Sequence, residues 1–314
     1  MLRLECRQHH LDSVVRASIP QRVSVVLRHY LRQAADRATQ IIYARRKFKL
    51  LMRTNFRDIN LRLQAVAAAS NFFSTAIRPV VISAPFGKSM LVIAPHQDDE
   101  VIGCGGAMAL QRRCGLATQV VVIQDGADEH QQVSLSRDEL RETRNAESRA
   151  AALIIDASEP IFLGQKELRN ESESIKAALR KIIETNQVDA IFTPFVLDGN
   201  ADHRSCNAIL ASVLMDVDRE IRVLQYEVWA NCIPNVAVII DDVMELKREM
   251  LSCFRFANSA LDYAHSTMGL NMFHSRMLPA GSARYVEAYF EAPRIEYIEL
   301  IAAVERAERG DKMC

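Results

Sequence analysis

The chain has 314 residues, of which 49% are hydrophobic and 25% charged, and its formal net charge at pH 7 is zero. This composition is typical of a globular protein, and no run of eighteen apolar residues occurs, so no transmembrane helix is expected. The seven cysteines include no CxxC pair and are odd in number, which argues against a structural zinc cluster or a disulfide framework and favours reduced thiols in a cytoplasmic protein.

The charge is distributed unevenly along the chain. Residues 1–88 hold 16 Lys and Arg residues against 4 Asp and Glu residues, so the remainder is acidic. Apolar residues recur at three- and four-residue spacing from about residue 21 to 75, which predicts helix. Prolines and a glycine then mark a connector. We therefore predict a basic helical N-terminal extension over residues 1–88 and a second domain over residues 89–314.

From Met90 the pattern changes to alternating strands and helices. Apolar runs rich in Val and Ile predict strands over residues 90–94, 119–124, 161–163, 190–194, 223–228 and 236–240. Helices are predicted over residues 103–113, 137–153, 173–185, 203–214 and 242–254. This alternation predicts an α/β fold, a three-layer sandwich whose mostly parallel sheet is covered by helices on both faces. Ligands of such sheets bind beyond the carboxyl ends of the strands.

Two polar clusters follow strands of this predicted sheet. His96, Asp98 and Asp99 come directly after the first strand, and the motif Asn200–His203 follows the strand over residues 190–194. Because the carboxyl ends of parallel strands meet at one edge of a sheet, the clusters indicate one site assembled from two loops. A structural alternative exists for the first cluster, since adjacent carboxylates also stabilise the N-terminus of a following helix.

The residue types in these clusters favour a catalytic metal. A catalytic Zn²⁺ takes three ligands from His, Asp and Glu side chains and keeps a fourth position for water. His96, Asp99 and His203 supply such a set, with Asp98 beside the water as a base. Asp202 and Glu100 are available to accept hydrogen bonds from the ligand imidazoles. The pattern therefore predicts hydrolysis by a metal-bound water, which the ion makes more acidic.

The same motifs resemble those of a known family. Residues 94–100 read APHQDDE and resemble the AHPDDE signature of the PIG-L/LmbE-like deacetylases, and residues 200–204 read NADHR and resemble that family's HPDHR signature. The helical segment Arg144–Glu147 is similar to the family's RxxE helix. The resemblance covers about residues 90–290, and residues 1–88 match nothing in it.

The resemblance implies a Rossmann-like fold, a Zn²⁺ ion and removal of an N-acetyl group from an amino sugar with release of acetate. Carried over by position, His96, Asp99 and His203 would bind the ion, Asp98 would be the general base and Asp202 would orient a ligand. We therefore expect a zinc-dependent N-deacetylase, with a small-molecule amino-sugar conjugate as substrate. The sugar is free or linked to a nucleotide, a lipid or a glycoside.

The sequence departs from the signatures at two positions. Gln97 replaces a proline, which need only alter the stiffness of the loop, and Asn200 replaces a histidine. An Asn side chain can donate one hydrogen bond to an oxyanion, worth about 3 kcal/mol, but no proton to a leaving amine. Either Asp98 takes both proton-transfer roles, or another group such as His130 or His274 enters the site, or activity is reduced. The alternatives to deacetylation are a weakened member that binds a sugar conjugate and an amidase for a larger N-acyl group.

Further residues are candidates for substrate binding. Asp125 ends a predicted strand near the site, and Arg144 could hold a sugar hydroxyl or a phosphate, or else pair with Glu147 on its own helix. His274 is the third candidate. Trp229 is interpreted as a core residue, with a sugar platform as the alternative. The glycines of Gly103–Gly106 are expected to let a helix approach the sheet closely.

Three interpretations of the basic extension remain. It packs on the acidic domain, or it binds anionic lipid headgroups and places the enzyme at the inner face of a membrane, or it binds nucleic acid. The domain contains no nucleic-acid motif, so nucleic acid is not expected as a partner. The sequence does not specify the oligomeric state.

Overall fold

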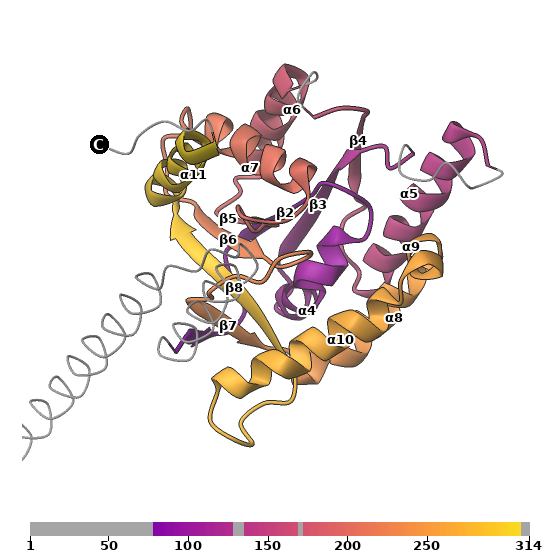
Figure 1. Ribbon diagram of the computed structural model, residues 1–314, viewed down its shortest axis with the longest axis vertical. Coiled ribbons are helices and arrows are strands. Elements are labelled where there is room, and N and C mark those ends of the chain that lie inside the picture. Colours follow the sequence, from indigo (N-terminus) through magenta and orange to yellow (C-terminus); the bar gives the residue numbers. More distant parts are fainter. Residues whose placement is uncertain (1–77, 128–134, 169–171, 309–314) are drawn as a thin grey trace, which may run out of the picture. The chain divides into compact units, whose positions relative to one another are not determined.

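The computed structural model describes residues 78–127, 135–168 and 172–308. They form one sheet with helices on both faces, so the predicted α/β fold is confirmed (Figure 1). The helix predicted over residues 21–75 and the candidate His130 lie outside the described residues. Within the described ranges, no helix is both long and apolar enough to cross a bilayer.

The sheet of the described residues has eight strands in the order β1-β7-β8-β6-β5-β2-β3-β4. Their bounds are β1 Val80–Ile82, β2 Ser89–Ala94, β3 Ala117–Gln124, β4 Ile161–Gln165, β5 Ala190–Pro194, β6 Arg222–Tyr226, β7 Val236–Ile239 and β8 Val286–Pro293. Neighbours pair in parallel except β8, which runs antiparallel to β6 and β7. From β2 the chain moves outward to β3 and β4 and then returns to β5 on the other side of β2. The junction of β2 and β5 is therefore a switch point, where α/β sheets bind ligands.

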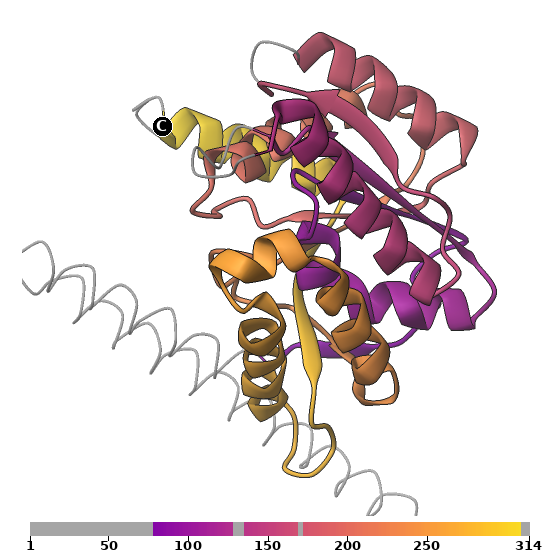
Figure 2. The same cartoon turned by 90° about the vertical axis from the view of Figure 1, so that its right-hand side faces the viewer.

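Helices cover the two faces of the sheet in separate groups. Their bounds are α4 Asp99–Arg113, α5 Arg137–Ile154, α6 Ser172–Thr185, α7 Ala201–Leu214, α8 Met244–Cys253, α9 Arg255–Ala260, α10 Tyr263–His274 and α11 Arg294–Glu308, with 3₁₀ turns η1 Asp241–Val243 and η2 Ser275–Met277. Helices α4, α5, α8 and α10 pack on one face, and α6, α7 and α11 pack on the other (Figures 1 and 2).

The central strand β2 shows why the strands of this sheet have continuous apolar sequences. Side chains alternate along a strand, so Met90 and Val92 enter the core beneath α4 while Leu91 and Ile93 enter the core beneath α7. All six residues of β2 are buried, since helices cover both faces. The strand is thus held rigidly on both sides just before the first polar cluster.

The folded domain begins ahead of the boundary predicted at residue 89. Strand β1 lies inside the predicted extension, yet it pairs with β7, with Val80 opposite Val236. Phe86 is buried and packs edge-on against the ring of Phe192, with the ring centroids 5.7 Å apart. Pro79 and Pro85, which led to the prediction of a connector, flank a strand of three residues that is too short to show a strand pattern in the sequence.

Helix α4 begins at Asp99, four residues before the predicted start at Gly103. A kink at Cys104 (φ −144°) interrupts it. An added Cβ would lie 2.0 Å from the Tyr226 ring at Gly103 and 2.6 Å from Ile240 at Gly106. These glycines allow the close approach of helix and sheet that was expected of them.

Candidate metal centre and active site

The two polar clusters meet at the carboxyl edge of the sheet. His96 follows β2, and His203 lies in the first turn of α7, after β5. Strands β2 and β5 are adjacent and parallel, with Leu91 opposite Ile191, so the loops that leave them face each other. The packing of two buried strands therefore brings together side chains about a hundred residues apart in sequence.

Three side-chain atoms form a compact triangle at this edge. His96 Nδ1 lies 3.1 Å from Asp99 Oδ2, His203 Nε2 lies 3.2 Å from the same oxygen, and the two ring nitrogens are 3.4 Å apart. All three residues are buried. A tetrahedral zinc ion with bonds of about 2.0–2.1 Å holds its ligand atoms about 3.3 Å apart. The side chains thus fit one cation of this size without rearrangement.

The charges of the triangle also suit a cation. Burial raises the pKa of Asp99, but the two imidazoles outweigh it and hold that pKa well below its usual range. Burial lowers the pKa of His203, but the Asp99 carboxylate and the contact with Asp198 raise it to about 9. A metal that binds here would replace a proton on His203, because imidazole ligates in its neutral form.

Asp198 orients His203 and was not found by the sequence reasoning. Its Oδ1 lies 3.3 Å from His203 Nδ1 and accepts the backbone N–H of Asn200 at 2.8 Å. Its Oδ2 accepts the backbone N–H of Trp229 at 3.0 Å. Asp202, expected to orient a ligand, lies beside the other imidazole, with its Oδ2 3.6 Å from His96 Nε2. A carboxylate behind an imidazole fixes the ring and strengthens metal binding.

Asp198→Asn is therefore expected to weaken Zn²⁺ binding by about 10- to 100-fold, since the amide cannot replace both acceptor oxygens. Competition against a chromophoric chelator measures this affinity. Asp189→Asn is the matched control, because Asp189 accepts backbone N–H groups of Lys88 and Ser89 at the opposite end of β5. Equal affinities for the two variants would contradict an orienting role for Asp198.

Asp98 stands at the start of α4 in a strained conformation. Its φ is 116°, in a region that costs a residue with a side chain about 1–3 kcal/mol. Its carbonyl accepts the N–H groups of Val101 and Ile102 at 3.0 Å, and its own N–H donates to Glu100 Oε2 at 2.9 Å. These bonds hold a backbone turn that places the Asp98 side chain in the wall of a cavity.

The surroundings of Asp98 favour proton transfer. Burial and the neighbouring Asp99 carboxylate raise the pKa of Asp98 well above its usual value, while Arg144, with Nη2 3.8 Å from Oδ2, lowers it. A carboxylate with raised proton affinity is a stronger base. Glu100, considered as a partner of a ligand imidazole, accepts from Asp98 N–H and from Ser148 Oγ, the latter at 3.0 Å. It supports the loop.

Asn200, which occupies the position of a histidine in the family signature, caps α7. Its Oδ1 accepts the backbone N–H of Asp202 at 2.8 Å, a favoured use of Asn at a helix start. This bond leaves the two N–H donors of its amide as the polar groups that it can offer to a ligand. Asn200 lines the same cavity as Asp98.

Arg144 and Gln97 fasten the first loop to α5. Arg144 donates to the carbonyls of Gly126 at 2.9 Å and Gln97 at 3.0 Å. Gln97 Nε2 donates to Asn145 Oδ1 at 2.9 Å and to the Asp125 carbonyl at 3.3 Å. The glutamine therefore restrains, through its side chain, a loop that proline stiffens in the family signature.

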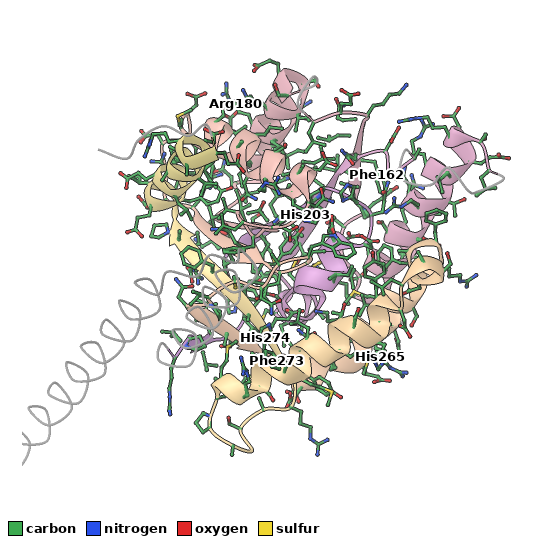
Figure 3. All side chains as sticks on the ribbon, viewed as in Figure 1. Phe162, Arg180, His203, His265, Phe273 and His274 are labelled. Carbon is green, nitrogen blue, oxygen red and sulfur yellow. The ribbon has the colours of Figure 1, made fainter. Side chains whose placement is uncertain are left out.

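The remaining candidate residues lie apart from the triangle. The Asp125 carboxylate pairs with Arg137 at 2.6 Å, and Glu147 accepts the N–H of Phe256 at 3.0 Å. His274, the last residue of α10, has Nε2 2.5 Å from Glu227 Oε2 and is buried. Figure 3 shows His203 near the centre of the view and His274 beside α10. Neither Asp125 nor His274 is among the residues that line the cavity.

The cavity has a volume of about 560 Å³, within the usual range for small-molecule sites. Its lining combines polar, aromatic and aliphatic residues: His96, Asp98, Asp99, Ile102, Arg144, Gly199, Asn200, Val228, Trp229 and Tyr263. Trp229 is 55% exposed. Its interpretation as a core residue was therefore wrong, because its side chain faces the cavity rim instead of the sheet.

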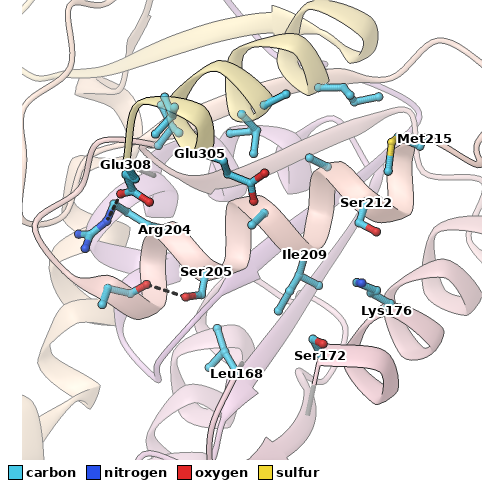
Figure 4. A pocket seen from close by; sticks show the side chains of 18 residues that line it. Leu168, Ser172, Lys176, Arg204, Ser205, Ile209, Ser212, Met215, Glu305 and Glu308 are labelled. Carbon is cyan, nitrogen blue, oxygen red and sulfur yellow. Dashed lines mark hydrogen bonds and ion pairs between the residues drawn. The ribbon is translucent and has the colours of Figure 1, made fainter. Parts of the chain in front are cut away.

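A second cavity, of about 480 Å³, lies between α6, α7 and α11 (Figure 4). It holds none of the candidate catalytic residues. Its lining mixes apolar side chains such as Ile209 and Ile301 with the exposed ion pair of Arg204 and Glu308, whose Nε and Oε1 are 3.3 Å apart. The reactive groups are in the first cavity.

Comparisons with known proteins agree with the fold. The family model PIG-L, described as GlcNAc-PI de-N-acetylase, matches residues 91–214. An N,N'-diacetylchitobiose deacetylase from Pyrococcus horikoshii is 22% identical with a TM-score of 0.61, covering 77% of this chain and 97% of that one. The A40926 pseudoaglycone deacetylase Dbv21 is 16% identical with a TM-score of 0.53, covering 65% and 97%. No curated protein matches the sequence.

The fold alone does not determine the reaction. The hydratase GalB of Pseudomonas putida, which acts on 4-carboxy-2-hydroxymuconate, is 19% identical with a TM-score of 0.56, covering 66% of this chain and 96% of that one. The assignment of a reaction therefore has to come from the site residues. The matched residues 91–214 contain both polar clusters, so the similarity of this chain to the PIG-L family model includes the candidate site residues.

Proposed function

We propose that this protein is a metal-dependent N-deacetylase that removes the acetyl group from an N-acetylated amino sugar and releases acetate. The observation that carries the proposal is the triangle of His96, Asp99 and His203, whose ligand atoms lie 3.1–3.4 Å apart beside Asp98. The description of the matching family supports the substrate class. Two imidazoles and one carboxylate favour Zn²⁺ as the ion.

A divalent cation bound by this triangle would polarise the acyl carbonyl and make the attacking water more acidic. Asp98 accepts a proton from that water as the water oxygen bonds to the carbonyl carbon. The amide donors of Asn200 are available to the carbonyl oxygen as it gains negative charge. Arg144 keeps the loop of Asp98 in place through its bonds to two backbone carbonyls.

The second half of the reaction returns the proton. When the bond between the carbonyl carbon and nitrogen breaks, the Asp98 carboxyl donates its proton to the leaving nitrogen, giving a free amine and acetate. The raised pKa of Asp98 suits both transfers. Among the described residues that line the cavity, the carboxyl groups are those of Asp98 and Asp99. The pKa of Asp99 is held low, so Asp98 is the carboxyl group that can carry the proton.

Purified protein loaded with Zn²⁺ is expected to release acetate from at least one member of a panel of N-acetylglucosamine conjugates. Removing the metal with a chelator should abolish release, and adding Zn²⁺ back should restore it. The metal content, measured separately, should be one ion per chain. Propionyl and butyryl analogues test whether a larger acyl group is preferred. A metal-loaded protein that cleaves no acyl group from any conjugate would contradict the proposal and leave a sugar-binding role.

A further inference from the structure

An aromatic pair, the exposed Trp229 and the half-buried Tyr263, lines the catalytic cavity. Trp229, three residues after the end of β6, and Tyr263, the first residue of α10, line the cavity together with His96 and Asp98. Their ring centroids are 6.0 Å apart and the planes are inclined by 79°, an edge-to-face contact. The Trp229 side chain is 55% exposed. An indole left this open to solvent beside catalytic groups is unusual for the core of a protein and common in ligand sites.

The position of Trp229 is fixed relative to the metal ligands. Asp198 accepts the backbone N–H of Trp229 with one oxygen, at 3.0 Å, and contacts His203 Nδ1 with the other, at 3.3 Å. A single buried carboxylate therefore ties the aromatic rim to the ligand triangle. The backbone N–H of Tyr263 donates to Asn258 Oδ1 at 3.0 Å. These bonds hold the backbone at the two residues from which the rings extend.

We propose that Trp229, supported by Tyr263, is a stacking surface for a pyranose ring of the substrate and determines specificity for ring sugars. The inference rests on the proposed function. One face of a pyranose presents C–H groups, which pack against the negative face of an indole and bury apolar area. The hydroxyl groups at the ring edge remain free for solvent and polar residues. A ring stacked on Trp229 would occupy the same cavity that Asp98 and the triangle line, which brings its acyl group within reach of them.

Intrinsic fluorescence tests this surface without catalysis, because Trp229 is the only tryptophan in the chain. Full-length protein stripped of metal is titrated with N-acetylglucosamine and with N,N'-diacetylchitobiose, and the acyclic polyol sorbitol serves as the control. We expect a saturable change in emission with a ring sugar and none with sorbitol. A response to the monosaccharide shows that one ring is enough for stacking, whereas a response to the disaccharide alone shows that binding requires a second ring.

The absence of a saturable change with either sugar would overturn the inference, whether or not the metal-loaded protein releases acetate. A fluorescence response without acetate release would instead retain the stacking surface and reject the proposed function. The two failures are thus distinguishable.

Kinetics of variants separate stacking from a structural role. Trp229→Ala should raise KM by about tenfold or more, as expected when a large aromatic contact is removed, with little change in kcat. Trp229→Phe should restore most of the affinity. Both variants keep the backbone N–H that Asp198 accepts, so their metal content should not change. Phe273→Ala is the matched control, since Phe273 is 47% exposed on α10 but stacks on Arg276 outside the cavity. An unchanged KM in Trp229→Ala would contradict stacking.

Discussion

Asp98→Asn is expected to lower the turnover number by about 10²- to 10⁴-fold while leaving the bound metal in place. Asparagine matches the shape of aspartate but cannot accept the proton of the attacking water. The substitution adds little backbone strain, because Asn tolerates positive φ as Asp does. The φ of 116° at residue 98 can therefore be kept. Acetate release and elemental analysis of the same preparation provide the two measurements.

His203→Ala is the counterpart of this variant. It removes one corner of the ligand triangle, so both the bound metal and the turnover should be lost. The two variants then separate the base from the ligands. Full turnover in Asp98→Asn would exclude Asp98 as the base, and loss of metal from it would make Asp98 a ligand.

The ligand set could be predicted from sequence because its members follow strands that are recognisable by themselves. The buried run of β2 ends directly before His96, and β5 ends shortly before His203. Parallel pairing of two such strands is enough to bring their following loops together. Asp198 escaped this reasoning because its role depends on contacts to Trp229 and His203, which lie on different elements.

The C-terminal part of the fold could not be predicted in the same way. Strand β8 reads VEAYFEAP, and its glutamates and final proline weaken the apolar pattern by which strands are recognised. It lies between β6 and β7, antiparallel to both, and this placement depends on contacts between elements that are distant in sequence. The charged Glu287 can occupy this buried strand because other elements of the fold supply its hydrogen-bond and ion-pair partners.

Glu287 and Lys247 form a buried ion pair that provides hydrogen-bond partners for backbone groups next to the kink in α4. The exposed fractions of their side chains are 1% and 0%, and Lys247 Nζ lies 2.6 Å from Glu287 Oε1. Helix α4 is interrupted at Cys104. Glu287 accepts the N–H groups of Gly106 and Ala107 at 2.8 Å, and Lys247 donates to the carbonyl of Ile102 at 3.0 Å. The pair thus satisfies helix groups on both sides of the kink.

Glu287→Ala is expected to lower the free energy of unfolding by about 3–5 kcal/mol, because it leaves a buried ammonium and two backbone N–H groups without their acceptor. Urea unfolding measures this loss. The matched control is Glu245→Ala, which removes the exposed partner of Arg248 on α8 and should change stability little. A similarly small loss for both variants would contradict a stabilising role of the buried pair.

The milder variant Glu287→Gln connects this pair to the active site. Glutamine keeps the size of the side chain but offers one acceptor oxygen in place of two. The N–H groups after the kink must then share this acceptor with Lys247, which holds the α4 segment before the kink through the Ile102 carbonyl. That segment begins with Asp99, and the first carbonyl that accepts its backbone N–H groups is that of Asp98. Weaker Zn²⁺ binding by a Glu287→Gln variant that remains folded would show that the buried pair positions the ligand triangle. Unchanged affinity would restrict its role to stability.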